Sequence, residues 1–148
     1  MTFTIRRGQL EDAHAIYGLA RQFTTGREPI GRDEFEVALD NVLRTRDQET
    51  NVLTVAATET GEVVGYSLMT VSRLLHAPGL TAHLQEIVVD PAVRGQGVGD
   101  QLMRANEQYC RGRGVRQLSA STARIGRFYN HLGFESMGEH YRKVLDIG

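Results

Sequence analysis

The positions of apolar residues divide the chain into segments with two different periodicities. Alternating or continuous β-branched stretches predict strands, and apolar residues three or four positions apart predict helices. Glycine and proline mark the turns between these segments. The predicted strands cover residues 2–6, 51–58, 63–75, 81–89, 115–122, 134–138 and 141–145. The predicted helices cover a segment from Leu10 to about residue 20, residues 33–43, a segment from about Gly97 to Gly112 or Gly114, and residues 125–132.

The order of these elements predicts an α/β fold. Short turns at residues 59–62 and 76–79 join consecutive strands as antiparallel hairpins. Residues 81–122 form a strand–helix–strand crossover, which is the connection that parallel strands require. We therefore expect a mixed, mostly antiparallel central sheet flanked by helices. No repeat, low-complexity tract or linker interrupts the chain, which predicts a single domain over residues 1–148.

Residues 83–103 combine a strand, a glycine-rich turn and the start of a helix. The β-branched run at residues 87–89 predicts a buried strand, and Pro91 ends it because proline has no N–H for the sheet. The first turn of a helix presents free N–H groups and the positive end of the helix dipole, which together favour an anion such as phosphate. Glycines remove the side chains that would keep that anion away. The turn consists of Arg94, Gly95, Gln96, Gly97, Val98 and Gly99.

The two commonest nucleotide-binding motifs do not fit this turn. A dinucleotide-binding fingerprint would need a glycine where the chain has Asp100. A P-loop needs a lysine followed by serine or threonine, and the only lysine of the chain is Lys143. A nucleotide-binding α/β domain is therefore the less favoured interpretation.

Two motifs of the chain resemble the GNAT superfamily of N-acetyltransferases. The pattern Arg94-x-x-Gly97-x-Gly99 resembles the R/Q-x-x-G-x-G/A motif, and residues 128–134 (FYNHLGF) resemble the F-Y-x-x-x-G-F stretch. The predicted element order is also that of the GNAT fold, so the resemblance covers nearly the whole chain. It implies acetyl-CoA as cosubstrate and an amine as acceptor. The cofactor-binding residues that it implies are Ile87, Val88, Val89, Arg94, Gly95, Gln96, Gly97, Val98, Gly99 and Thr122.

The resemblance also implies catalytic roles for two side chains, with direct attack of the amine in a ternary complex. Tyr129 matches the general acid of the family, and a phenol with a pKa of about 10 can protonate the leaving thiolate. Glu86 lies where family members often carry a base, and strand alternation places it on one face with Leu84 and Val88. The backbone N–H of Val88 would polarise the thioester carbonyl. Thr122 stands where many members have asparagine, and its hydroxyl can still donate one hydrogen bond.

Each candidate also has a purely structural interpretation. Tyr129 has the spacing of a core aromatic residue, and Glu86 could be a solvated or paired carboxylate. His76 and His83 are weaker candidates for catalysis, because a lone histidine is more often structural or exposed. We interpret Cys110 as structural. A non-catalytic acyl-CoA-binding module would keep the glycine turn without needing Tyr129 or Glu86, so the presence of both favours an enzyme.

The acceptor is expected near residues 24–31, the second helix and the turn at residues 138–141, and such loops vary widely on one scaffold. Carboxylates there would attract an ammonium group, and arginines would suit an acceptor with its own carboxylate. Overall neutrality favours a small amine-bearing molecule, with a lysine or N-terminus of a protein as the alternative. The charged residues expected at the mouth are Glu28, Asp33, Glu34, Glu86, Glu139, Arg27 and Arg32.

Composition and charge narrow the possible binding partners and the expected location of the protein. A net charge of −1 gives no electrostatic reason to bind nucleic acid or an anionic membrane. The single cysteine permits a reducing compartment, and no apolar run predicts a signal peptide or a transmembrane helix, so a cytoplasmic location is expected. No metal-ligand cluster and no Ser-His-Asp spacing is found in the sequence, which predicts that no metal is needed. A homodimer remains open.

Overall fold

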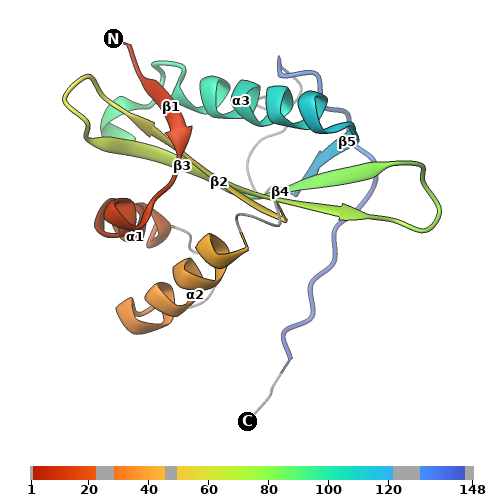
Figure 1. Ribbon diagram of the computed structural model, residues 1–148, viewed down its shortest axis with the longest axis horizontal. Coiled ribbons are helices and arrows are strands. Elements are labelled where there is room, and N and C mark those ends of the chain that lie inside the picture. Colours follow the sequence, from red (N-terminus) through yellow and green to blue (C-terminus); the bar gives the residue numbers. More distant parts are fainter. Residues whose placement is uncertain (1, 23–28, 46–49, 122–130, 146–148) are drawn as a thin grey trace.

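A five-stranded sheet carries helices on both faces, as the computed structural model shows (Figure 1). The structure describes residues 2–22, 29–45, 50–121 and 131–145. The strands lie in the order β1-β2-β3-β4-β5, and every neighbouring pair is antiparallel except the parallel pair β4 and β5. This arrangement confirms the predicted mixed, mostly antiparallel sheet flanked by helices. The strands are β1 (Thr4–Arg7), β2 (Asn51–Ala57), β3 (Val63–Arg73), β4 (Leu80–Val89) and β5 (Val115–Ala120).

The helices divide between the two faces of the sheet. Helices α1 (Ala13–Ala20) and α2 (Arg32–Arg44) cover one face, and α3 (Val98–Arg113) covers the other (Figure 1). Two short 3-10 turns, η1 (Leu10–Asp12) and η2 (Pro91–Val93), precede α1 and follow β4. No helix in the described ranges is long and apolar enough to cross a bilayer. Each helix buries apolar side chains against the sheet: Ile16 and Leu19 of α1, Phe35 and Leu39 of α2, and Val98, Leu102 and Met103 of α3.

A glycine in β3 sets how closely α3 approaches the sheet. A Cβ atom at Gly65 would lie 3.1 Å from Cγ1 of Val98 and 3.2 Å from the carbonyl oxygen of Val88. Both distances are tighter than ordinary van der Waals contact, so a larger residue would push the start of α3 outward. Because Gly65 has no side chain, the N-terminus of α3 can lie directly against β3 and β4.

The two C-terminal strands predicted from the sequence are wrong for the described residues. Residues 134–145 form no strand, and large apolar side chains there are exposed, including Met137 at 77% and Tyr141 at 83%. Alternation marks side chains that could line a pleat, but it does not provide a neighbouring strand with which to pair. Gly138 also has a φ of 143°, a backbone conformation that interrupts an extended run. Of the predicted helix at 125–132, residues 125–130 lie outside the described part of the chain.

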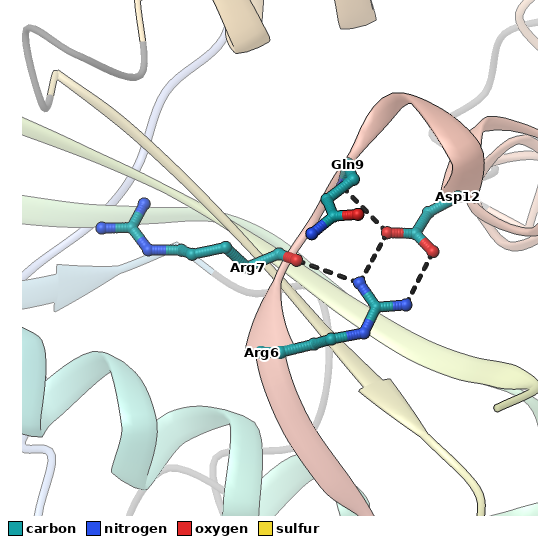
Figure 2. Close-up of polar contacts among 4 residues, drawn as sticks. All are labelled: Arg6, Arg7, Gln9 and Asp12. Carbon is teal, nitrogen blue, oxygen red and sulfur yellow. Dashed lines mark hydrogen bonds and ion pairs between the residues drawn. The ribbon is translucent and has the colours of Figure 1, made fainter.

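An ion pair joins β1 to the start of the first helix (Figure 2). The guanidinium of Arg6 donates to both carboxylate oxygens of Asp12, at 2.8 Å each, and to the backbone oxygen of Arg7 at 3.0 Å. The backbone N–H of Gln9 also donates to Asp12, at 2.8 Å. Hydrogen bonding by Arg6 holds the pKa of Asp12 below its usual range, against the opposing effect of burial. The carboxylate is therefore ionised throughout the neutral range and fixes the corner between the strand and the helix.

Replacing Asp12 with asparagine should lower the free energy of unfolding at pH 7 by about 2 kcal/mol, because charge-assisted hydrogen bonds to a buried carboxylate are lost. The pKa of Asp12 is lower in the folded state, so its contribution is present above the unfolded value of about 3.9 and is lost as the pH falls through the folded value. Urea unfolding at pH 7 and at pH 3 checks both points. Glu36→Gln is the control, since its pair with Arg32 is exposed and should matter by less than about 0.5 kcal/mol. Equal effects of the two substitutions would contradict the prediction.

Candidate active site

The glycine turn has the backbone geometry expected for an anion site. Gly95 and Gly97 have φ values of 83° and 84°, in the left-handed region that glycine adopts readily. Gly97 is the N-cap of α3 and no side chain caps the helix, so the N–H groups of its first turn are left for a ligand. A Cβ atom at either glycine would have no neighbour within 4 Å, so these positions face open space rather than the protein interior. The turn fits a phosphate or pyrophosphate group.

Hydrogen bonds anchor this turn to the end of β4. The carboxylate of Asp90 accepts from the N–H of Ala92 at 2.9 Å, which closes the turn after the strand. Arg94 donates through Nε to the backbone oxygen of Val89 at 3.3 Å, and through an Nη atom to the side-chain oxygen of Gln22 at 3.3 Å. Of the other predicted residues of the turn, Gln96 is exposed. Val98 is buried as the first residue of α3.

Strands β4 and β5 pair over only part of their length. Their parallel register runs from Leu80 opposite Val115 to Leu84 opposite Ala120 and then stops, while β4 continues to Val89. The predicted cofactor-binding residues Ile87, Val88 and Val89 lie in this continuation, where their side chains are buried. The structure therefore brings them to the end of β4 that leads into the glycine turn.

Because β4 contains a bulge, the predicted assignment of its side chains to the two faces is wrong for Leu84. In the register of β3 with β4, Leu68 is opposite Glu86 but Met69 is opposite Leu84, so Gln85 is an extra residue. Leu84 packs with the α3 cluster that also contains Ile87 and Val89. Glu86 and Val88 lie on the opposite face, toward α1 and α2. Simple alternation had placed Leu84 with Glu86 and Val88, and the extra residue is the reason that it failed.

Glu86 is held by a tyrosine that the sequence did not single out. The hydroxyl of Tyr66 on β3 donates to Oε1 of Glu86 at 2.6 Å, and only 2% of Tyr66 is exposed. Burial, followed by the negative charge of Glu86 and the hydrogen bond itself, raises the pKa of Tyr66 far above its ordinary value. The phenol is therefore protonated and acts as a donor that orients the carboxylate. A tyrosine within an apolar strand is common, so the pattern carried no signal for this role.

Glu86 and Tyr66 line a cavity of about 440 Å³ between the sheet and the two helices α1 and α2. This volume lies in the range typical of small-molecule sites. Of the side chains expected at the mouth, Glu86 alone lines the cavity among those described, while Arg27 and Glu28 lie outside the described residues. The remaining lining is Ile16, Ala20, Ile30, Phe35, Ala38, Leu39, Val42, Leu53, Leu68 and Gln85.

The weaker candidates of the sequence lie away from this cavity. His83 contacts Ser119 on β5, with 2.8 Å between Nδ1 and Oγ. Burial, and to a lesser extent His140, lowers the pKa of His83, so its imidazole is neutral at pH 7. His76 is an exposed turn residue. The Cys110 thiol is buried in contact with the sulfur of Met69, and burial raises its pKa, which supports a structural role.

Two predicted site residues, Tyr129 and Thr122, lie outside the described residues. The third glycine of the turn, Gly99, is in the first turn of α3. Across the described ranges, no group of three or more histidine, cysteine, aspartate or glutamate side chains is placed to hold a metal ion. The described site thus consists of a glycine turn with the geometry of an anion site, the end of β4 and a cavity bearing one oriented carboxylate.

Comparison with known proteins identifies the family. Residues 49–136, more than half of the chain, match the model of the Acetyltransferase (GNAT) domain. The chain is 27% identical to glucosamine 6-phosphate N-acetyltransferase 1 of Oryza sativa subsp. japonica, over 89% of this chain and 81% of that protein. It is 26% identical to the peptidyl-lysine N-acetyltransferase YjaB of Salmonella typhimurium, over 100% of this chain and 92% of that protein. Identity to the aminoalkylphosphonate N-acetyltransferase of the same species is 29%, over 95% and 90%.

A solved structure agrees with these matches at the level of the fold. The crystal structure of a transcriptional regulator from Bacillus halodurans C-125 superimposes with a TM-score of 0.86 at 24% identity, and covers 97% of this chain and 100% of that chain. The superposition agrees with the predicted fold, and the match to the family model confirms the resemblance drawn from the two motifs. The chain belongs to the GNAT family of acetyltransferases.

Proposed function

We propose that the protein transfers the acetyl group of acetyl-CoA to a primary amine on a small molecule, by direct attack within a ternary complex. The observation that carries this proposal is Glu86, a carboxylate oriented by a buried tyrosine and facing a cavity beside β4. An amine is cationic in water and must lose a proton before it can attack. A fixed carboxylate both attracts the ammonium group and accepts its proton.

The binding of acetyl-CoA, which GNAT acetyltransferases use in general, is assigned to the turn and to β4. The open space at Gly95 and Gly97 and the uncapped start of α3 suit its pyrophosphate. Once bound, it supplies an activated acetyl group. We assign its pantetheine arm to the backbone of residues 87–89 and to the hydroxyl of Thr122, and its phosphates to residues 94–99. The contact expected from the N–H of Val88 does not fit the register, because Asp90 donates to Val64 and antiparallel alternation then turns the N–H of Val88 toward Tyr66 of β3. We therefore assign stabilisation of the thioester carbonyl to an N–H of residues 87–89 that faces away from β3.

Proton transfer is divided between two residues in the proposed mechanism. Glu86 takes the proton of the amine, either directly or through one water molecule. Tyr66 stays protonated and keeps Oε1 of Glu86 in place, so the carboxylate does not have to reorganise during the reaction. Tyr129 gives its proton to the departing thiolate, because a phenol is protonated at pH 7 and can act as a general acid.

A lysine or N-terminus of a protein is the alternative acceptor, and a relative named as a peptidyl-lysine N-acetyltransferase supports it. A screen that detects the free thiol of CoA decides between the two when small amines and lysine-containing peptides are compared at matched concentrations. We expect turnover of small amines. Turnover of peptides alone would show that the acceptor is a protein and not a small molecule. Binding of acetyl-CoA without thiol release from any acceptor would favour a non-catalytic acyl-CoA-binding module.

Replacing Tyr129 with phenylalanine should lower kcat by about 100-fold, the low end of general-acid effects, because the ring remains while the proton is lost. The affinity for acetyl-CoA should change little. Steady-state kinetics and calorimetric titration measure the two quantities. Tyr109→Phe on α3 is the matched control, since its hydroxyl accepts a hydrogen bond from Arg113 away from the cavity. Wild-type kcat in Tyr129→Phe would return Tyr129 to a structural role.

A further inference from the structure

The cavity that holds Glu86 is apolar almost throughout. Among its described lining residues Glu86 is the one charged side chain, and Tyr66 and Gln85 are the other two with polar groups. Tyr66 is engaged with Glu86, and the amide nitrogen of Gln85 donates to the hydroxyl of Thr70 at 3.0 Å. The rest of the lining consists of aliphatic side chains and Phe35. A ligand in this cavity therefore meets one carboxylate and otherwise hydrocarbon.

The wall formed by α1 and α2 is built to stay in place. The ring of Tyr17 packs on Phe35 with 5.2 Å between centroids, and its hydroxyl donates to the backbone oxygen of Ile30 at 3.3 Å. The guanidinium of Arg32 lies over the same Tyr17 ring, 5.2 Å from its centre, and is paired with Glu36 at 3.0 Å. These contacts join α1, the segment before α2 and α2 itself. Arg32 therefore contacts side chains of this wall and does not line the cavity.

We infer that the acceptor is a primary amine with an apolar body, such as an alkylamine or an arylalkylamine, and not a phosphorylated or phosphonate-bearing amine. This inference rests on the proposed function, because it assigns the cavity to the acceptor. The ammonium group meets Glu86, and the hydrocarbon part lies against α1 and α2 with its surface removed from water. An acceptor phosphate would lie among apolar side chains without a described cationic partner, at a large desolvation cost.

The inference separates this chain from two of its relatives by chemistry. The acceptors named for those relatives, glucosamine 6-phosphate and an aminoalkylphosphonate, each carry a phosphorus-containing anion. Recognition of such an anion calls for arginine, lysine or helix N–H groups at the far end of the acceptor from the amine. Among the described residues that line this cavity, none is an arginine, a lysine or a histidine.

The test compares straight-chain amines from ethylamine to hexylamine, phenylethylamine, aminoethylphosphonate, glucosamine 6-phosphate and a lysine-containing peptide, with the full chain and saturating acetyl-CoA. We expect kcat/KM to rise about threefold to fourfold for each added methylene until the cavity is full, as burial of hydrocarbon predicts. The two phosphorus-containing amines should react more slowly than hexylamine. A flat dependence on chain length, or a preference for either phosphorus-containing amine, would overturn the inference.

Two variants test whether the cavity determines the preference for longer alkylamines. Ala38 on α2 lines the cavity, and Ala38→Phe should shift the chain-length profile toward shorter amines, with about a tenfold loss of kcat/KM for hexylamine. Ethylamine should be nearly unaffected. Val37→Phe adds the same ring one position along the helix, at a residue that is 64% exposed and does not line the cavity, so its profile should match the wild type. An unchanged profile in Ala38→Phe would also overturn the inference.

The same panel separates failure of the inference from failure of the proposed function. Transfer to peptides or to phosphorylated amines without any gain from hydrocarbon would leave the acetyltransferase intact and remove the apolar acceptor. Binding is a second readout that does not need turnover. With CoA present, hexylamine should raise the melting temperature of the protein more than ethylamine does, and Ala38→Phe should reduce that difference. Equal shifts for both amines in the wild type would count against the cavity as the acceptor site.

Discussion

Gly97→Val is expected to lower the affinity for acetyl-CoA by at least about 100-fold, which corresponds to about 2.7 kcal/mol. Gly97 has a φ of 84° and caps α3, and its missing side chain faces open space at the start of that helix. A valine there would place two methyl groups where the pyrophosphate is expected. It would also favour a different backbone conformation and so turn the N–H groups of the turn away from the ligand.

Thermal unfolding with and without acetyl-CoA measures this effect. At 100 times its dissociation constant, acetyl-CoA should stabilise the wild type by about 2.7 kcal/mol, and most of that should be lost in the variant. Gly61→Val is a matched control. Gly61 has a φ of 89°, and a side chain there would also face open space, but it lies in the hairpin between β2 and β3. The two variants carry similar backbone strain, so normal binding by Gly97→Val would show that the turn is not the phosphate site.

Glu86→Gln is expected to lower kcat/KM at pH 7 by about 100-fold to 1000-fold, within the range of general acid–base catalysis. Glutamine keeps the shape of the side chain, but it cannot accept the proton of the amine or attract its charge. Raising the pH should partly rescue the variant. Alkylamines resemble lysine with a pKa near 10, so the fraction of free amine rises about tenfold for each pH unit below that value.

The pH profile of kcat/KM is therefore the measurement that decides the role of Glu86. Glu62→Gln, at an exposed position of the β2–β3 hairpin, should behave as the wild type. Tyr66→Phe should cause a smaller loss than Glu86→Gln, because the carboxylate remains. Profiles of Glu86→Gln and wild type that differ only by a constant factor would mean that the amine arrives deprotonated.

The sequence predicted the described fold well up to the end of β5. Strands β1 to β5 and helices α1 to α3 all fall on segments with clear periodicity, and the glycine turn joins β4 to α3 as predicted. Long periodic segments give the most reliable predictions of secondary structure, because many residues follow the same spacing. The predicted strands at 134–138 and 141–145 were short, and they failed because pairing depends on a partner that local alternation cannot reveal.

The candidate site was predictable only in part, for a different reason. The turn was singled out by a motif and Glu86 by its place in the strand, but the position of Leu84 on the face opposite Glu86 was not predicted. A bulge adds one residue to a strand and leaves the composition of that strand unchanged, so Gln85 gave no sign that alternation would break. Tyr66 and the apolar cavity also depend on contacts between distant segments, with Tyr66 and Glu86 twenty positions apart in the chain. Such contacts become visible only when the strands are paired.

A single-turnover reaction with acetyl-CoA labelled in the acetyl group tests the central claim most directly. The protein is mixed with labelled acetyl-CoA and an alkylamine, and the label is followed by mass spectrometry in the amine, in the protein and in the remaining acetyl-CoA. We predict that the label passes into the amine in step with release of free CoA, and that no labelled protein is formed. Label bound covalently to the protein before it reaches the amine would contradict direct attack in a ternary complex. Acetyl-CoA that binds and stays unchanged with every acceptor would contradict the proposed catalytic activity of this chain.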